Sequence, residues 1–415
     1  MNRLKNLIMS DGFNHASASV FSILIGLVFG FIILLISNPA QAVDGFIIIL
    51  KGGFSTGAKG MGQVLYFATP LILTGLSVGF AFKTGLFNIG APGQFIMGAF
   101  AAVYIGVKWT FLPAPWHWIA ALLGAAVIGG LWALIPGLLK AYMNVHEVIA
   151  TIMMNYIGMY LANHMVKVTV YDSKKALSMN VADSAVLPKG GLDYVFYNHL
   201  GNTKDMSTVN CGIWIALLIA VVIYIVLNKT TFGYELKACG YNQNASKYAG
   251  INEKRNVVLS MVIAGMLAGL GGGLLYLSGA NGRRIKVVDV LAVEGFNGIP
   301  AALLGLSNPL GIIFSAIFIS YITQGGNYLQ RLNFVPEVID IIIACIIYFS
   351  AFSLIIRNLI SRILKSRREK ARTDEAVPAE AQTVAEAEAT VDIVTAADTE
   401  ATAQTEVKEE GSELL

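Results

Sequence analysis

The sequence predicts an all-α protein that crosses a membrane many times. The chain has 415 residues, of which 55% are hydrophobic and only 13% are charged, whereas a soluble domain carries about 25% charged residues. The apolar residues fall in runs long enough for a helix to cross about 30 Å of hydrocarbon. Such a chain cannot cover itself with polar side chains, so we expect lipid to surround most of it.

Ten apolar runs are bounded by charged residues, proline or glycine, and each predicts a membrane-spanning segment. They cover residues 19–37, 62–82, 86–107, 116–139, 147–166, 212–227, 257–278, 291–306, 310–324 and 338–356. We therefore expect a polytopic helix bundle of about ten transmembrane segments over residues 19–356, preceded by a short cytoplasmic segment, residues 1–18. The first run is longer than the roughly 7–15 residues of a signal-peptide core, so we expect it to be retained.

Two of these runs are interrupted by helix-breaking residues. The interruptions are Gly90, Pro92 and Gly93 in the run 86–107, and Gly295, Gly298 and Pro300 in the run 291–306. A broken helix leaves backbone groups unpaired, which a membrane protein tolerates only where protein or a water-filled cavity surrounds them. We expect two broken or re-entrant helices inside the bundle, beside a translocation path; kinked packing helices are the alternative.

Polar side chains at membrane depth need a partner or a wet cavity. The candidates for a substrate path are Asn88, Gln94, Asn155, Glu294 and Asn297. Amides suit a neutral, hydrogen-bonding solute such as a sugar or a nucleoside, whereas a cation path would show more acidic residues. For a single asparagine, a hydrogen bond between helices is the alternative role.

Basic residues predict the orientation in the membrane. The densest basic cluster lies in the juxtamembrane segment 357–372, and the linker 228–256 is basic as well. With an even number of spans, both termini and this linker are expected in the cytoplasm, and the loop 167–210 outside the cell. Residues 373–415 are rich in Ala, Glu and Thr and predict a disordered acidic tail. Three basic residues in 283–286 oppose this orientation.

The sequence contains no pattern typical of an enzyme or a metal site. Residues 52–60 resemble a phosphate-binding loop, but Ala58 stands where that loop requires lysine. The cysteines, Cys211, Cys239 and Cys345, form neither a disulfide framework nor a metal-ligand spacing. The net charge is only +3 and forms no basic stripe, so we expect no nucleic-acid partner. We expect a membrane transporter without catalytic residues, metal or cofactor.

Three stretches carry a resemblance to a known family. Residues 84–94 (TGLFNIGAPGQ), 147–161 (EVIATIMMNYIGMYL) and 295–311 (GFNGIPAALLGLSNPLG) resemble permease subunits of bacterial nucleoside ABC importers, which are related to ribose and branched-chain amino-acid permeases. The sequence departs from that pattern at Pro92 and Pro300. The resemblance implies a nucleoside permease working by alternating access. A ribose-type sugar permease is the alternative within the superfamily, and an ion-coupled secondary transporter or channel is the alternative from another class.

The resemblance also implies partners. Such a permease works with a second permease subunit, two cytoplasmic ABC ATPase subunits and an extracellular solute-binding lipoprotein. Residues 233–251 resemble the loop that couples these permeases to their ATPases, and the candidate coupling residues are Gly233, Glu235, Lys237, Gly240, Asn242, Lys247 and Gly250. Taken alone, this stretch predicts a short interfacial helix bounded by turns. The sequence leaves open which nucleoside is carried and whether the permease pair is homomeric or heteromeric.

Overall fold

The computed structural model describes residues 11–196, 207–279 and 282–351. The predicted basic segment 357–372 and acidic tail 373–415 lie outside these residues. The chain divides into two compact units, of which residues 19–353 form one and residues 1–18 with 354–415 form the other. All contacts described below lie within the unit 19–353.

Helices dominate the described residues, which confirms the all-α prediction. In chain order they are α2 (Asp11–Ser37), α3 (Ala42–Lys51), α4 (Ala58–Lys83), α5 (Ala91–Lys108), α6 (Trp116–Met143), α7 (Glu147–Thr169), α8 (Leu192–Val195), α9 (Gly212–Lys229), α10 (Thr231–Tyr241), α11 (Gln243–Tyr248), α12 (Glu253–Tyr276), α13 (Val293–Phe296), α14 (Gly298–Leu304), α15 (Pro309–Asn327) and α16 (Pro336–Ala351). Short 3-10 turns are η1 (Gly52–Thr56), η2 (Asp183–Ala185) and η3 (Tyr328–Leu332), and the two strands are β1 (Tyr171–Asp172) and β2 (Leu177–Ser178).

Several of these helices can cross a membrane. Among the described residues, five are both long and apolar enough, namely α4, α6, α9, α12 and α15 with η3. The described apolar part of α2 is shorter, Leu24–Ser37. Helices α5 and α7 have sufficient length, but polar residues such as Gln94 and Asn155 make them less apolar. By these criteria of helix length and composition, the described residues contain fewer candidate spans than the roughly ten that were predicted.

Helix α12 packs against α4, α5 and α6 at once. Glycines at four-residue spacing, Gly265, Gly269 and Gly273, lie on its contact surface. A carbon added at Gly269 would lie 2.4 Å from the backbone oxygen of Ala125 on α6, so the two backbones touch. Helices in lipid associate through such close packing, because lipid is as apolar as their side chains. The small residues at this spacing therefore serve the packing of α12.

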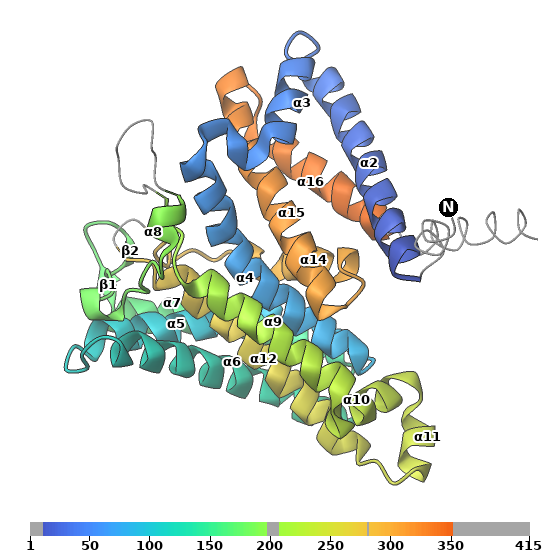
Figure 1. The fold of residues 1–415 in the computed structure, drawn as a ribbon. Helices are drawn as coiled ribbons and strands as arrows, with labels where there is room; N and C mark the ends of the chain where they lie inside the picture. Colours follow the sequence, from blue (N-terminus) through green and yellow to red (C-terminus); the bar gives the residue numbers. More distant parts are fainter. Residues whose placement is uncertain (1–10, 197–206, 280–281, 352–415) are drawn as a thin grey trace, which may run out of the picture. The chain divides into compact units, whose positions relative to one another are not determined.

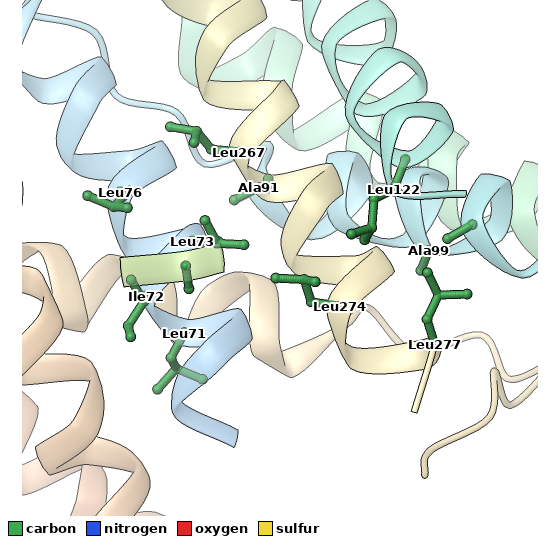
Figure 2. Close-up of a cluster of buried hydrophobic side chains, with 14 of the residues drawn as sticks. Leu71, Ile72, Leu73, Leu76, Ala91, Ala99, Leu122, Leu267, Leu274 and Leu277 are labelled. Atoms are coloured by element: carbon green, nitrogen blue, oxygen red, sulfur yellow. The ribbon is translucent and has the colours of Figure 1, made fainter. Parts of the chain in front are cut away.

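The core between these helices contains many leucine, isoleucine and alanine side chains (Figure 2). Labelled there are Leu71, Ile72, Leu73 and Leu76 of α4, Ala91 and Ala99 of α5, Leu122 of α6, Leu267 and Leu274 of α12, and Leu277 directly after α12. Because such a core is close-packed, polar side chains within it must find their partners inside the protein.

Residues 170–196 form an ordered cap on one end of the helices. Its strands β1 and β2 pair antiparallel. The N–H of Ala182 donates to the carbonyl of Gly106 near the end of α5, at 2.8 Å, and that of Leu187 donates to Leu277 after α12, at 3.0 Å. The described part of the predicted external loop is thus fixed to the ends of two helices.

Helices α10 and α11 form a hairpin at the other end of α12 (Figure 1). The side chains of Thr230, Asn242 and Asn252 cap α10, α11 and α12, each accepting from the N–H three residues later. Helix α12 has 24 residues and is about 36 Å long at 1.5 Å per residue. Hairpin and cap are therefore separated by more than the roughly 30 Å thickness of a hydrocarbon core.

Helix α3 was not predicted. Helix α3 has 10 residues, too few to cross a membrane. Its Ile49 is buried in a cluster with Leu34 of α2 and Ile322 of α15. At the end of α3, Gly52 has a φ of +46°, and a carbon added there would lie 2.4 Å from the ring of Tyr321. Glycine at this position therefore allows α3 to turn tightly against α15.

Candidate functional site

The first predicted break lies between α4 and α5. Residues 84–90 form a non-helical turn in which Gly85 has a φ of +71°, a conformation that glycine adopts without strain. Helix α5 then starts at Ala91, so Pro92 stands in the first turn, where its missing N–H costs no helical hydrogen bond. The glycine and proline residues thus begin a helix here instead of interrupting one.

Asn88 and Gln94 form a reciprocal amide pair at this break. The Nε2 of Gln94 donates to Oδ1 of Asn88 at 3.0 Å, and Nδ2 of Asn88 donates to Oε1 of Gln94 at 2.9 Å. Asn88 also accepts from the N–H of Gly90 at 3.1 Å and donates to Oγ of Ser77 at 3.3 Å. The two side chains are 0% and 1% exposed. Both side chains have protein partners here, because the turn places them opposite each other.

Asn155 of α7 completes the same break. Its Oδ1 accepts from the N–H of Gly93 at 2.9 Å, and its Nδ2 donates to the carbonyl of Ile89 at 2.9 Å. A carbon added at Gly93 would lie 2.8 Å from the Cα of Asn155, so the absence of a side chain there permits this approach. Asn155 therefore supplies partners to two backbone groups in and beside the turn that begins α5.

The second predicted break consists of the short helices α13 and α14. A carbon added at Gly295 would lie 2.4 Å from the Cα of Pro92, so α13 touches the start of α5. Gly298 approaches Thr74 of α4 equally closely, and Oγ1 of Thr74 donates to the backbone oxygen of Glu294 at 3.2 Å. The two breaks are thus in contact with each other and with α4.

Glu294 and Asn297 differ from the three buried amides. The carboxylate of Glu294 pairs with the guanidinium of Arg283, and the two side chains are 16% and 49% exposed. Asn297 is half-buried between α13 and α14, and its side chain has no hydrogen-bond partner among the described residues. The structure thus places the five predicted path residues in two groups. Their role in solute passage stays a prediction.

The α10–α11 hairpin is held by backbone contacts at two predicted coupling residues. A carbon added at Gly240 would lie 2.6 Å from the carbonyl oxygen of Lys83 and 3.0 Å from the nitrogen of Gly85. A carbon added at Gly233 would lie 2.1 Å from the carbonyl oxygen of Val226 on α9. The hairpin therefore touches the turn that begins the first break, a contact between distant segments that no local sequence pattern predicts.

The other candidate coupling residues are more accessible. Glu235 accepts a hydrogen bond from Nδ2 of Asn256 on α12 at 3.2 Å. Lys237 is half-buried and Lys247 is exposed. Gly250 has a φ of +81° in the turn between α11 and α12. Glu235 thus links the hairpin to α12, whereas Lys247 lies on its exposed surface.

Two hydroxyl side chains at the breaks were missed in the sequence. Thr74 and Ser77 lie on α4 and bind Glu294 and Asn88, respectively. The sequence pattern that could have predicted them is a pair of polar residues three positions apart within an apolar run, a spacing that places both on one face of a helix.

Comparison with known proteins identifies the family. A family model described as "Branched-chain amino acid transport system / permease component" matches residues 60–351. The chain belongs to this permease family. The matched residues of the permease include both breaks and the α10–α11 hairpin.

Several relatives are similar to the permease over most of their length. The guanosine ABC transporter permease protein NupP of Bacillus subtilis is 38% identical over 85% of this chain and 97% of its own. The nucleoside ABC transporter permease protein NupB of Lactococcus lactis is 34% identical over 84% and 95%. The glucose ABC transporter permease protein TsgB13 of Haloferax volcanii is 30% identical over 71% and 76%. No solved structure matches the chain.

These relatives are transporter subunits and not enzymes. The family and the apolar helices together make the permease a multi-pass membrane protein.

Proposed function

We propose that the permease is the membrane-spanning subunit of an ATP-binding-cassette importer that takes up nucleosides. The observation that carries the proposal is the similarity to the guanosine and nucleoside permeases, which covers nearly their whole length. ATP hydrolysis takes place on separate subunits. The permease itself supplies the path for the solute.

A sugar is the second candidate solute, because the glucose permease of Haloferax volcanii is also related. That similarity is lower and covers less of both chains than the similarity to the nucleoside permeases. We therefore favour nucleosides. Membership of the permease family disfavours an ion-coupled transporter or channel.

The proposed assembly contains a second permease subunit, two ATPase subunits and an extracellular solute-binding lipoprotein. The α10–α11 hairpin docks on the ATPase. In support, its tyrosines Tyr234, Tyr241 and Tyr248 are 70%, 91% and 95% exposed, and aromatic residues are enriched at the centres of protein interfaces. The hairpin and both termini then lie in the cytoplasm and the cap outside, with about ten spans between them.

The contact between Gly240 and Gly85 allows a movement of the hairpin to be transmitted to the solute path. In this proposal, movement of α10 displaces the turn that carries Asn88. Because Pro92 touches Gly295, the displacement also reaches the second break. Alternating access then follows from movement of the two breaks along α4.

Uptake of labelled nucleosides tests the proposed function. Cells that lack the gene should lose uptake of guanosine or uridine and regain it with the gene on a plasmid, while labelled glucose and ribose serve as the competing solutes. Uptake of a sugar but of neither nucleoside would replace the proposed solute.

Charge reversal tests the coupling role of the hairpin. The double variant Lys237→Glu with Lys247→Glu should stay in the membrane but lose the ATPase on purification and lose uptake. The matched control is Lys174→Glu with Lys175→Glu, which makes the same charge change on the exposed turn between β1 and β2, and it should keep the ATPase. Normal ATPase binding and uptake in the hairpin variant would refute the coupling role.

A further inference from the structure

A cavity of about 420 Å³ opens between the first turns of α4 and the last turns of α15. Its lining includes Lys59, Gln63 and Phe67 of α4, and Gln324, Asn327 and Tyr328 at the end of α15. This site is distinct from the buried amides, because Asn88 follows the opposite end of the 26-residue α4. The volume lies within the range of about 300–1,000 Å³ of small-molecule pockets.

The amides of the cavity retain unused hydrogen-bonding groups. Oε1 of Gln63 accepts from Oγ1 of Thr208 at 2.9 Å, and its Nε2 has no partner among the described residues. Nε2 of Gln324 donates to the hydroxyl of Tyr328 at 3.4 Å, and its Oε1 is likewise unpaired in the described part of the chain. The exposed side chain of Asn327 makes no hydrogen bond to any described residue. The cavity therefore offers both donors and acceptors to a solute.

The charge and aromatic content of the cavity restrict that solute. None of the described lining residues is acidic, and Lys59 brings a positive charge. The guanidinium of Arg283 lies 4.8 Å from the ring centre of Phe67, and that of Arg331 lies 5.1 Å from that of Tyr328. A cationic solute is therefore disfavoured. Two aromatic rings beside amides suit a flat, electron-rich ring that carries hydrogen-bonding groups.

Side chains connect the cavity to the second break. Lys59, Gln63 and Phe67 follow each other at four-residue spacing, so they lie along one face of α4. Arg283, which covers the ring of Phe67, pairs with Glu294 of α13. The cavity is thus connected through Phe67 and Arg283 to Glu294, a predicted path residue.

We infer that this cavity is a binding site for the transported nucleoside, occupied before the solute reaches the two breaks. Phe67 and Tyr328 contact the base with the ring face or edge that the guanidinium groups of Arg283 and Arg331 leave uncovered, and the amides bind the ribose hydroxyls and the polar edge of the base. The inference rests on the proposed function, since it assigns a site to the solute named there.

Leucine substitutions test the site in the complete importer. Gln63→Leu and Gln324→Leu should each lower the rate of guanosine or uridine uptake at a nucleoside concentration well below saturation by about threefold to tenfold, the effect of losing one hydrogen bond. The matched control is Gln330→Leu, an exposed glutamine in η3 outside the cavity lining, and it should keep the full rate. Rates are divided by membrane abundance and by the amount of co-purified ATPase, which removes effects on folding or assembly.

Cysteine labelling tests occupancy without transport. In the purified complex with its three native cysteines replaced by alanine, Asn327→Cys should react with a maleimide, and guanosine or uridine should slow that reaction. The control Gln330→Cys should react at the same rate with and without nucleoside.

The outcomes separate the two claims. If the unmodified permease restores no nucleoside uptake, the proposed function fails and the cavity loses its proposed solute. If it restores uptake but both leucine variants keep the full rate, or nucleosides do not slow labelling of Asn327→Cys, the cavity assignment is overturned and the proposed function stands.

Discussion

The amide side chains beside the two ends of α4 differ in whether their hydrogen-bonding groups are paired within the protein. At the first break, Asn88, Gln94 and Asn155 use their donors and acceptors on one another and on the backbone. At the cavity, Gln63 and Gln324 each keep an unpaired group among the described residues. Amides whose donors and acceptors are paired within the protein stabilise an interrupted backbone. Amides that keep an unpaired group beside an open cavity are available to a solute. The same residue type thus serves two purposes in one helix bundle.

The largest effect on stability is expected for Asn155→Leu. The substitution leaves the N–H of Gly93 and the carbonyl of Ile89 unpaired in the interior, and each unpaired group costs about 1–3 kcal/mol. We expect a loss of about 2–6 kcal/mol, seen as a lower melting temperature in detergent and lower membrane abundance. Asn244→Leu on the exposed surface of α11 is the control. An unchanged melting temperature would show that Asn155 does not hold the break.

A loss of similar size, about 2–6 kcal/mol, is expected for Asn88→Leu, because the buried amide of Gln94 and the N–H of Gly90 both lose a partner. The double variant Asn88→Leu with Gln94→Leu should be less destabilised than the sum of the two single variants, since no lone amide is left. A thermal-melting cycle measures this coupling. Simple additivity would argue against the reciprocal pair, and lost uptake per folded molecule would add a transport role for Asn88.

Thr74→Val should cost about 0.5–1.5 kcal/mol, because it removes a hydroxyl proton that the carbonyl of Pro70, at 3.0 Å, shares with the backbone oxygen of Glu294, at 3.2 Å, while nearly keeping the side-chain shape. The matched control is Thr323→Val, whose hydroxyl bonds only to Ile319 within its own helix. Melting curves of the two variants compare them directly. Equal melting temperatures would mean that the contact between α4 and the second break adds no stability.

The smallest effect on stability is expected at the cavity. Gln324→Leu removes a single long hydrogen bond at 3.4 Å to Tyr328, so we expect a change within about 0.5 kcal/mol. Its uptake should nevertheless fall as described above. A large drop in melting temperature would place Gln324 with the structural amides and weaken the contrast between the two ends of α4.

The sequence alone determined the class of fold and the position of its interruptions. Apolar runs predict membrane helices because the length needed to cross hydrocarbon is fixed by helix geometry. Glycine and proline residues located both breaks, since these residues constrain the backbone locally. The capped α10–α11 hairpin is also a local feature, since residues 233–251 alone predict a short helix bounded by turns. The short helix α3 was missed because its apolar run is below the spanning length.

Only the tertiary structure decided what the polar residues do. Whether an amide is satisfied depends on groups far away in the chain, as when Asn155 binds Gly93 and Ile89. The contact of Gly240 with Gly85 and the cavity between α4 and α15 likewise join segments distant in sequence. A local pattern can show that a polar group lies at membrane depth, but its partner is fixed by helix packing, which no single segment encodes.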